Sequence, residues 1–252
     1  NLTKHDEVIF HDNDFEVFLN PNGDNHLYGE LELNARNTTW DLLLTKPYRD
    51  GGRAINAWEI LGLNTAVHID GTLNDPRDKD TGWTVEIKWP WAGLKELVAE
   101  PIVPPKNGDK WRINFSRVEW DTEIVEGKYT KIPDRREYNW VWSPQGVIDM
   151  HRPERWGYLQ FSTAKPGKDE FRPDPDWAFR DLLHRAYYAQ RAYHKTNGKY
   201  ATTLPQLGLK DAGKLSLETT RSGFEASVTL PAEKGAKPRR LTIAQDSRIW
   251  AE

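Results

Sequence analysis

Short runs in which hydrophobic residues recur at every second position constrain the fold of this chain more than any other feature. They occupy residues 15–19, 27–33, 83–89, 111–116 and 156–161. Each run predicts a strand with one buried face. Gly, Pro, Asn and Asp separate the runs, and no long helical period intervenes. The first part of the chain is therefore predicted to be mostly β, an antiparallel β-sandwich over residues 1–163.

The composition changes at residues 164–175, where Pro, Gly and charged residues indicate a linker. A helix is predicted beyond it, with Asp174 as its cap, Pro175 in its first turn and Asn197-Gly198 as its end. Short strands are predicted to follow. Residues 176–252 thus form a small α+β unit with one long helix and a small antiparallel sheet.

Charge and composition exclude several classes of function. The chain has 35 basic and 38 acidic residues and no cysteine. This near balance argues against nucleic acid as a partner, and the absence of thiols excludes cysteine nucleophiles and cysteine-ligated metal centres. No run reaches the roughly 18 apolar residues of a membrane span. The first residue is not methionine, so we expect a processed or truncated product.

Tryptophan is unusually frequent, because ten of the 12 tryptophans precede residue 164. Most tryptophans in any domain fill its core, but so dense a set predicts that two or three contact a ligand.

Several segments in order resemble family 9 carbohydrate-binding modules and their DOMON-like relatives. These are residues 13–24 with 28–34, the W-x-V-E-x-x-x-P-W pattern of residues 83–91, residues 107–117, and residues 142–157. The resemblance spans about residues 6–163. A weaker resemblance, to the helix and N-G-x-Y passage of pilin-like folds, covers part of the C-terminal unit.

The family resemblance implies a jelly-roll or DOMON-like sandwich with an aromatic sugar-binding face. It also implies export to the periplasm or the outside, structural calcium, and work beside glycosidases in xylan or cellulose catabolism. Family members usually begin with two or three further strands, so we expect the first strands of the fold to be missing here.

Trp142 is the first candidate for a sugar platform. It lies two residues after Trp140, and alternation on a strand puts both rings on one face. The alternative is that both rings are core. The resemblance implies a second tryptophan around the sugar. Trp40 or Trp120 is the candidate, and Trp58 is the next choice after them.

Polar candidates surround these rings. Arg117 and Glu119 follow the 111–116 strand, where they either bind hydroxyls or form a surface or interstrand ion pair. Asn34 lies with Glu32 on a strand where family members often carry an arginine, which is absent here. His151 is either a hydroxyl ligand or a structural residue.

Asp12 and Asp14, and the acidic loop 75–80, are the calcium candidates, because carboxylates suit this ion. Solvated acidic loops are the alternative. A haem-binding DOMON-like redox module is a second alternative function, with Met150 and His151 as ligands. We expect neighbours on a strand to face opposite sides, which argues against that pair.

A glycoside hydrolase of the xylanase type is a further alternative and needs two carboxylates around the scissile bond. Glu86, Glu119 and Asp41 are the nominees, but no catalytic motif accompanies them. A purely structural or adhesive module with a basic tail is a third alternative. The sequence favours non-catalytic binding of a xylan- or cellulose-type polysaccharide or its oligosaccharides.

Overall fold

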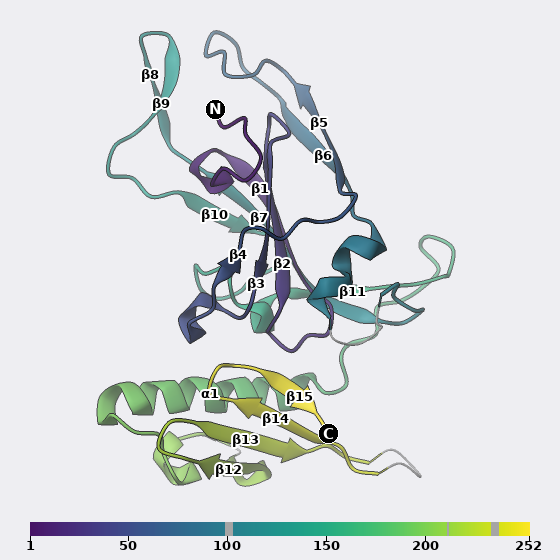
Figure 1. Ribbon diagram of the computed structural model, residues 1–252, viewed down its shortest axis with the longest axis vertical. Helices are drawn as coiled ribbons and strands as arrows, with labels where there is room; N and C mark the ends of the chain where they lie inside the picture. The colour runs from purple at the N-terminus through teal and green to yellow at the C-terminus, as the bar shows by residue number, and fades with distance from the viewer. Residues whose placement is uncertain (99–102, 211, 233–236) are drawn as a thin grey trace. The chain divides into compact units, whose positions relative to one another are not determined.

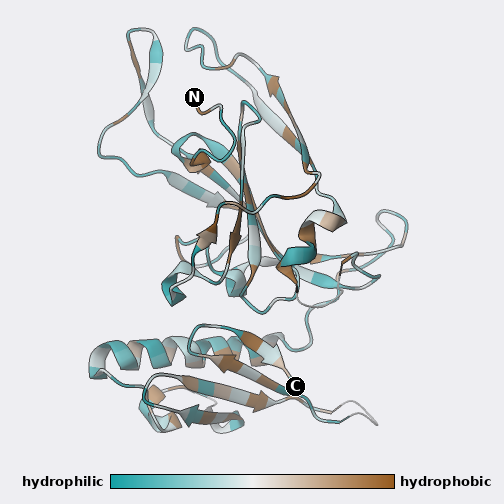
Figure 2. Cartoon of the chain, in the orientation of Figure 1, coloured by the Kyte–Doolittle hydropathy of each residue, from teal (hydrophilic) through white to brown (hydrophobic). Residues whose placement is uncertain are grey.

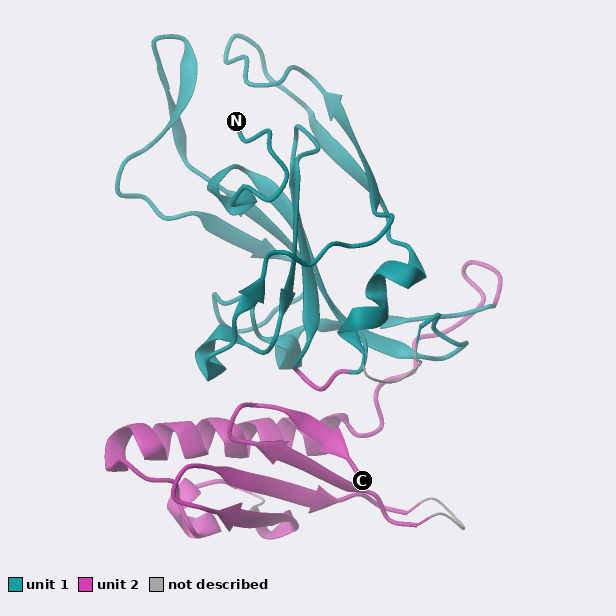
Figure 3. Ribbon diagram, in the orientation of Figure 1, with its two compact units in different colours: residues 1–22, 26–163 teal, residues 23–25, 164–252 magenta. Residues whose placement is uncertain are grey.

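The computed structural model describes residues 1–98, 103–210, 212–232 and 237–252. The chain divides into two compact units (Figure 3). Unit 1 comprises residues 1–22 and 26–163, and unit 2 comprises residues 23–25 and 164–252. The predicted fold class, mostly β with an antiparallel sheet and one long helix, is confirmed. Within the described residues, no helix combines the length and the hydropathy of a membrane span.

Unit 1 is built on a seven-stranded antiparallel sheet (Figure 1). Its strands run in the order β10-β7-β1-β2-β3-β4, and β11 also pairs with β7. The bounds are β1 (Asp14–Asn20), β2 (Tyr28–Asn34), β3 (Thr39–Leu44), β4 (Ala54–Ile55), β7 (Lys110–Glu119), β10 (Tyr138–Val141) and β11 (Gly157–Gln160). All the strand runs predicted in this unit, including that of β6 below, are found as strands.

The sheet buries both of its faces, whereas alternation predicted one buried face. Val17, Leu31 and Ile113 lie on the apolar face and belong to one core cluster. The opposite face of the same strands carries buried acidic residues, among them Glu16 and Glu32. This face is covered by Phe10, which precedes β1, by Tyr48, which follows β3, and by Met150 and His151, which are far away in the sequence.

A second layer packs on the apolar face. It consists of the hairpin of β5 (Asn64–Asp70) and β6 (Gly82–Lys88) together with the 3-10 segment η3 (Trp91–Leu97). Another hairpin, β8 (Thr122–Val125) with β9 (Lys128–Lys131), has an exposed residue at every position. Both hairpins extend to the same end of unit 1 (Figure 1). The arrangement is sandwich-like, with a large sheet and a much smaller second layer.

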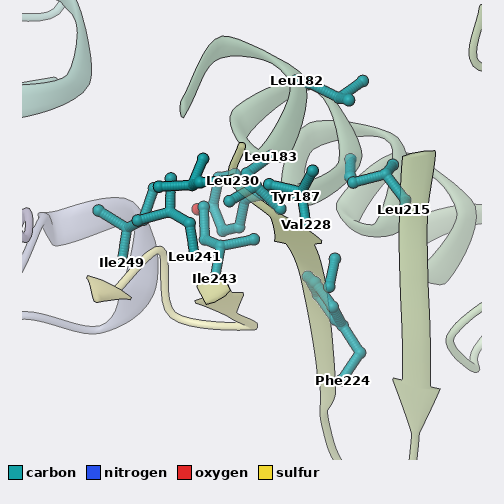
Figure 4. Close-up of a cluster of buried hydrophobic side chains, with 12 residues drawn as sticks. Leu182, Leu183, Tyr187, Leu215, Phe224, Val228, Leu230, Leu241, Ile243 and Ile249 are labelled. Atoms are coloured by element: carbon teal, nitrogen blue, oxygen red, sulfur yellow. The ribbon is translucent and has the colours of Figure 1, made fainter. Parts of the chain in front are cut away.

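In unit 2 the helix α1 (Trp177–Asn197) packs on a four-stranded sheet. The strands, in sheet order, are β12 (Leu215–Thr219), β13 (Phe224–Thr229), β14 (Arg240–Ala244) and β15 (Ile249–Ala251). Side chains from the helix and from all four strands make up its core (Figure 4). Much of α1 is hydrophilic, while β13 and β14 contain hydrophobic residues (Figure 2), as expected for a helix with one buried stripe.

The helix ends as predicted but begins later. Gly198 follows Asn197 in the left-handed conformation, with φ of 66°. The predicted N-cap was Asp174, but Asp176 occupies that position. The carboxylate of Asp174 accepts a hydrogen bond from the Asp176 N–H at 3.0 Å, so it stabilises the turn before the helix instead.

Candidate functional site

Two aromatic residues lie on one face of the edge strand β10, and a third, Trp142, continues the row one residue beyond its end. Tyr138, Trp140 and Trp142 occupy every second position and are 46%, 62% and 49% exposed. Tyr138 and Trp140 lie opposite Glu119 and Arg117 on β7. The prediction that Trp140 and Trp142 share a face is confirmed, and the alternative that both are core is wrong. We call these three residues the aromatic strip.

Trp142 is fixed in place by its neighbours on β7 and β11. Its ring meets that of Phe115 edge-on, with centroids 5.1 Å apart, and its backbone N–H donates to the Phe115 carbonyl at 3.1 Å. A Cβ atom on Gly157 would come within 2.6 Å of Cζ2 of the Trp142 ring. Only glycine therefore lets the ring lie where it does.

Arg117 and Glu119 accompany the strip on the adjacent strand. Their side chains are partly exposed and form an ion pair, with Arg117 Nη2 3.0 Å from Glu119 Oε1. The ion-pair alternative is thus what the structure shows. Because both groups reach solvent, they keep capacity to hydrogen-bond a ligand beside the rings.

The two protruding hairpins border a groove of about 360 Å³, which we call the hairpin groove. Trp120 lines it together with Trp83 and Tyr129. The indole N–H of Trp120 donates to the Phe10 carbonyl at 2.9 Å, and Lys131 Nζ lies 3.5 Å from the centroid of its ring. This cation covers one face of the Trp120 ring, so that face is not open to a sugar.

Asn34 also lines the hairpin groove, but its side-chain amide is fully engaged. Its oxygen accepts from the N–H groups of Arg36 and Thr38, and its nitrogen donates to the Leu2 carbonyl and to Asp12. Asn34 therefore fixes the turn after β2.

On the opposite face of the sheet from the apolar core lies a cavity of about 370 Å³, the carboxylate cavity. Glu16, Glu30 and Glu32 line it, and Asp14 follows on the same face of β1. Burial, followed by repulsion among these groups, raises the pKa of Asp14 to about 10 and the pKa of Glu30 and Glu32 well above the usual value. Burial raises the pKa of Glu16 to about 7.

Trp40, Met150 and His151 line the same cavity. His151 Nδ1 is 2.9 Å from the Tyr28 hydroxyl, and burial lowers its pKa to about 4. Neither Met150 nor His151 is part of a strand. The strand argument against a Met150–His151 ligand pair is therefore wrong, because alternation does not apply to an irregular segment.

The remaining candidates have structural partners. Trp58, the last-ranked candidate for the second sugar platform, is buried in the apolar core and has no ring face open to a sugar. Asp41 is buried and accepts a hydrogen bond from the Ile60 N–H, Glu86 is exposed, and Asp12 accepts from the Leu2 N–H at 2.8 Å.

In the acidic loop the carboxylates bind protein donors. Hydrogen bonds from Arg77 lower the pKa of Asp75 to about 2, while Asp78 and Asp80 accept from Thr72. Among the described residues, this loop contributes no group of three metal ligands. The groups that do gather are Asp14 with Glu16 and Glu32, and His5 with Asp41 and Glu59.

Tyr138, Glu16 and Glu30 were missed as candidates. The period-two pattern that relates Trp140 to Trp142 includes Tyr138 and was sufficient to find it. Nothing in the sequence distinguishes Glu16 and Glu30 from exposed strand residues. Comparisons of the chain with protein-family models, curated proteins and solved structures find no match.

Proposed function

We propose that unit 1 binds a polysaccharide of the xylan or cellulose type, or its oligosaccharides, along the aromatic strip and without cleaving it. One observation carries this proposal: Tyr138, Trp140 and Trp142 expose about half of each side chain in a row on an edge strand. Exposed large aromatic residues in a contiguous row are rare on a protein surface that has no partner.

The strip has the chemistry that a sugar chain needs. A pyranose ring has a flat C–H face that packs on an aromatic plane and a rim of hydroxyls that requires polar partners. Arg117 and Glu119 provide a cation and an anion next to Trp140 and Tyr138. Three positions along a strand span roughly 13 Å. This length suits several sugars of a chain better than one monosaccharide.

The strip residues line neither the hairpin groove nor the carboxylate cavity. An open edge suits the interior of a polysaccharide chain, whereas an enclosed pocket suits a chain end. We therefore include binding to internal sugars in the proposal.

The carboxylates nominated for the hydrolase alternative occupy three different strands, β3, β6 and β7. Glu119 forms an ion pair with Arg117, and Asp41 is buried and accepts a hydrogen bond from the Ile60 N–H. None of these environments supplies an exposed acid and base facing one sugar, so binding is favoured over cleavage.

The test compares Trp142→Ala with Trp177→Ala, which removes a similarly exposed tryptophan from unit 2. Affinity electrophoresis in gels with soluble xylan or a soluble cellulose derivative should show retardation of the unaltered chain and of Trp177→Ala. Trp142→Ala should migrate as in a gel without polysaccharide. Equal retardation of both variants, or of none, contradicts the proposal.

Hydrolysis is monitored in the same samples by chromatography of xylo- and cello-oligosaccharides after prolonged incubation. Intact oligosaccharides are expected. Shortened products that disappear in Glu119→Gln would establish the hydrolase alternative instead.

A further inference from the structure

The carboxylate face of unit 1 concentrates negative charge in a way that the sugar-binding proposal does not use. Asp14, Glu16, Glu30 and Glu32 are each no more than 3% exposed. Glu16 lies directly opposite Glu32 in the pairing of β1 with β2. Burial is the main cause of the raised pKa of Asp14, Glu30 and Glu32, and repulsion from the other carboxylates of the group is the next. Buried charges of one sign require protonation or a counter-ion.

Backbone donors hold two of these carboxylates in place. The Val118 N–H donates to Asp14 Oδ1 at 3.2 Å, and the Phe10 N–H donates to Glu32 Oε2 at 2.8 Å. The other oxygen of Asp14, and one oxygen each of Glu16 and Glu30, have no hydrogen-bond partner within the described structure. The group is thus positioned and yet unsatisfied.

A second observation does not depend on the acidic residues. Asn114 and Ser116 on β7 face the same side of the sheet, with Ser116 directly opposite Glu16 and Asn114 in the adjacent row. Both side chains are almost completely buried. Among the described residues, neither amide atom of Asn114 has a hydrogen-bond partner. Neutral polar side chains are rarely buried in this way unless something is bound beside them.

We propose that this face binds one divalent cation, with Ca²⁺ as the preferred ion and Asp14, Glu16 and Glu32 as its ligands. Each of the three offers a carboxylate oxygen, and these oxygens all lie within 4.8 Å of one another. Glu30 lines the same cavity, and Ser116 lies directly opposite Glu16 on β7, so both are further candidate oxygen ligands.

Ligand chemistry and spacing select the ion. A donor set made only of oxygens suits hard cations. Two ligands of one Ca²⁺ at 2.3–2.6 Å can be about 5 Å apart, and six to eight oxygens are tolerated in flexible geometry. Mg²⁺ needs its ligands within roughly 4 Å of one another in a strict octahedron. Of the calcium candidates from the sequence, this site includes Asp14 but neither Asp12 nor the 75–80 loop.

Protons and the cation compete for the same oxygens, because carboxylate ligands must lose their protons to bind metal. The aromatic strip is on the other face of β7, so this proposal does not rest on sugar binding.

The experiment is calorimetric titration of CaCl₂ into the full chain after dialysis against EDTA, with MgCl₂ titrated in parallel. We expect one Ca²⁺ per chain, with weaker binding of Mg²⁺. Glu16→Gln and Glu32→Gln keep the size of the side chain but remove a ligand charge, and each should weaken binding at least about tenfold.

Two matched controls each remove a carboxylate elsewhere. Asp78→Asn alters the acidic loop, and Glu59→Gln alters the group with His5 and Asp41. Both should bind Ca²⁺ like the unaltered chain. The proposal is overturned by absent Ca²⁺ binding at millimolar concentration, by a preference for Mg²⁺, by unchanged affinity in both Glu16→Gln and Glu32→Gln, or by lost affinity in either control. Circular dichroism of each variant confirms that it is folded.

Discussion

The two faces of the central sheet in unit 1 come from the same strands and are both buried, but their chemistry is opposite. One face packs Val17, Leu31 and Ile113 against the second layer. The other packs Glu16 and Glu32 beneath loop segments. An alternating strand is usually interpreted as hydrophobic inside and polar outside. Here the polar half is also inside, so its burial has to be compensated by bound protons or by a ligand.

The largest effect is expected on the apolar face. Leu31→Ala removes a fully buried side chain from a packed core and leaves a cavity. We expect a loss of about 3 kcal/mol in the free energy of unfolding, measured by urea denaturation. A loss below about 1 kcal/mol would mean that this face is loosely packed, and the contrast with the carboxylate face would fail.

The carboxylate face should make stability depend on pH in the direction opposite to ordinary acid denaturation. The folded Glu16 carboxyl has a pKa of about 7, against 4.5 when unperturbed, so the folded state binds the proton more tightly. The protonated Glu16 carboxyl therefore contributes fully to the free energy of unfolding below pH 4.5, and this contribution is lost as the pH rises through 7. The loss in EDTA should be on the order of 3 kcal/mol, measured by urea denaturation across this range. The prediction is contradicted if the free energy of unfolding stays constant or increases over this pH range and if Glu16→Gln shows the same pH dependence as the unaltered chain.

Replacing one buried carboxyl sharpens the same contrast. In EDTA at pH 8, Glu16→Gln should stabilise the chain by about 2 kcal/mol, because the amide removes the cost of burying an ionised carboxylate. Thermal denaturation measures the change. With CaCl₂ present the sign should reverse, because the variant lacks a ligand. Destabilisation in EDTA would show that the ionised carboxylates are compensated within the protein.

At the exposed margin of the apolar face, Gly157→Ala should displace the Trp142 ring, since a Cβ atom has no room beneath it. We expect about tenfold weaker binding of a xylo- or cello-oligosaccharide, equivalent to about 1.4 kcal/mol, measured by calorimetry. Gly146→Ala is not a suitable control because Gly146 has positive φ, but Gly213→Ala is suitable because its added Cβ meets nothing within 4 Å. If Gly157→Ala binds the oligosaccharide as tightly as Gly213→Ala, the position of the ring does not matter.

The smallest effect concerns the partly exposed ion pair. Arg117→Ala should change stability by less than about 1 kcal/mol, because exposed ion pairs contribute little. It should weaken oligosaccharide binding only a few-fold, while Lys4→Ala, away from the strip, leaves it unchanged. A loss as large as that of Trp142→Ala would make the arginine, rather than the rings, the main source of affinity.

Local periodicity was enough to predict much of the fold and part of the site. The alternation of Trp140 and Trp142 determined their common face, and Asn197-Gly198 determined the end of α1. Both features depend on residues close in sequence. The start of α1 was harder, because Asp174 and Asp176 have equivalent side chains and only the backbone turn between them selects the cap.

The sequence by itself determined which residues lie on which face of each strand, because side chains alternate wherever the backbone is extended. Only the tertiary structure decided which faces are covered. Trp58 became core and Trp142 remained exposed although both are tryptophans in a β-rich region. Glu16 and Glu32 became buried because the segment around Phe10 and the segment around His151, which follows Glu32 by more than 100 residues, close over them. Burial depends on such distant segments, and no local pattern records it.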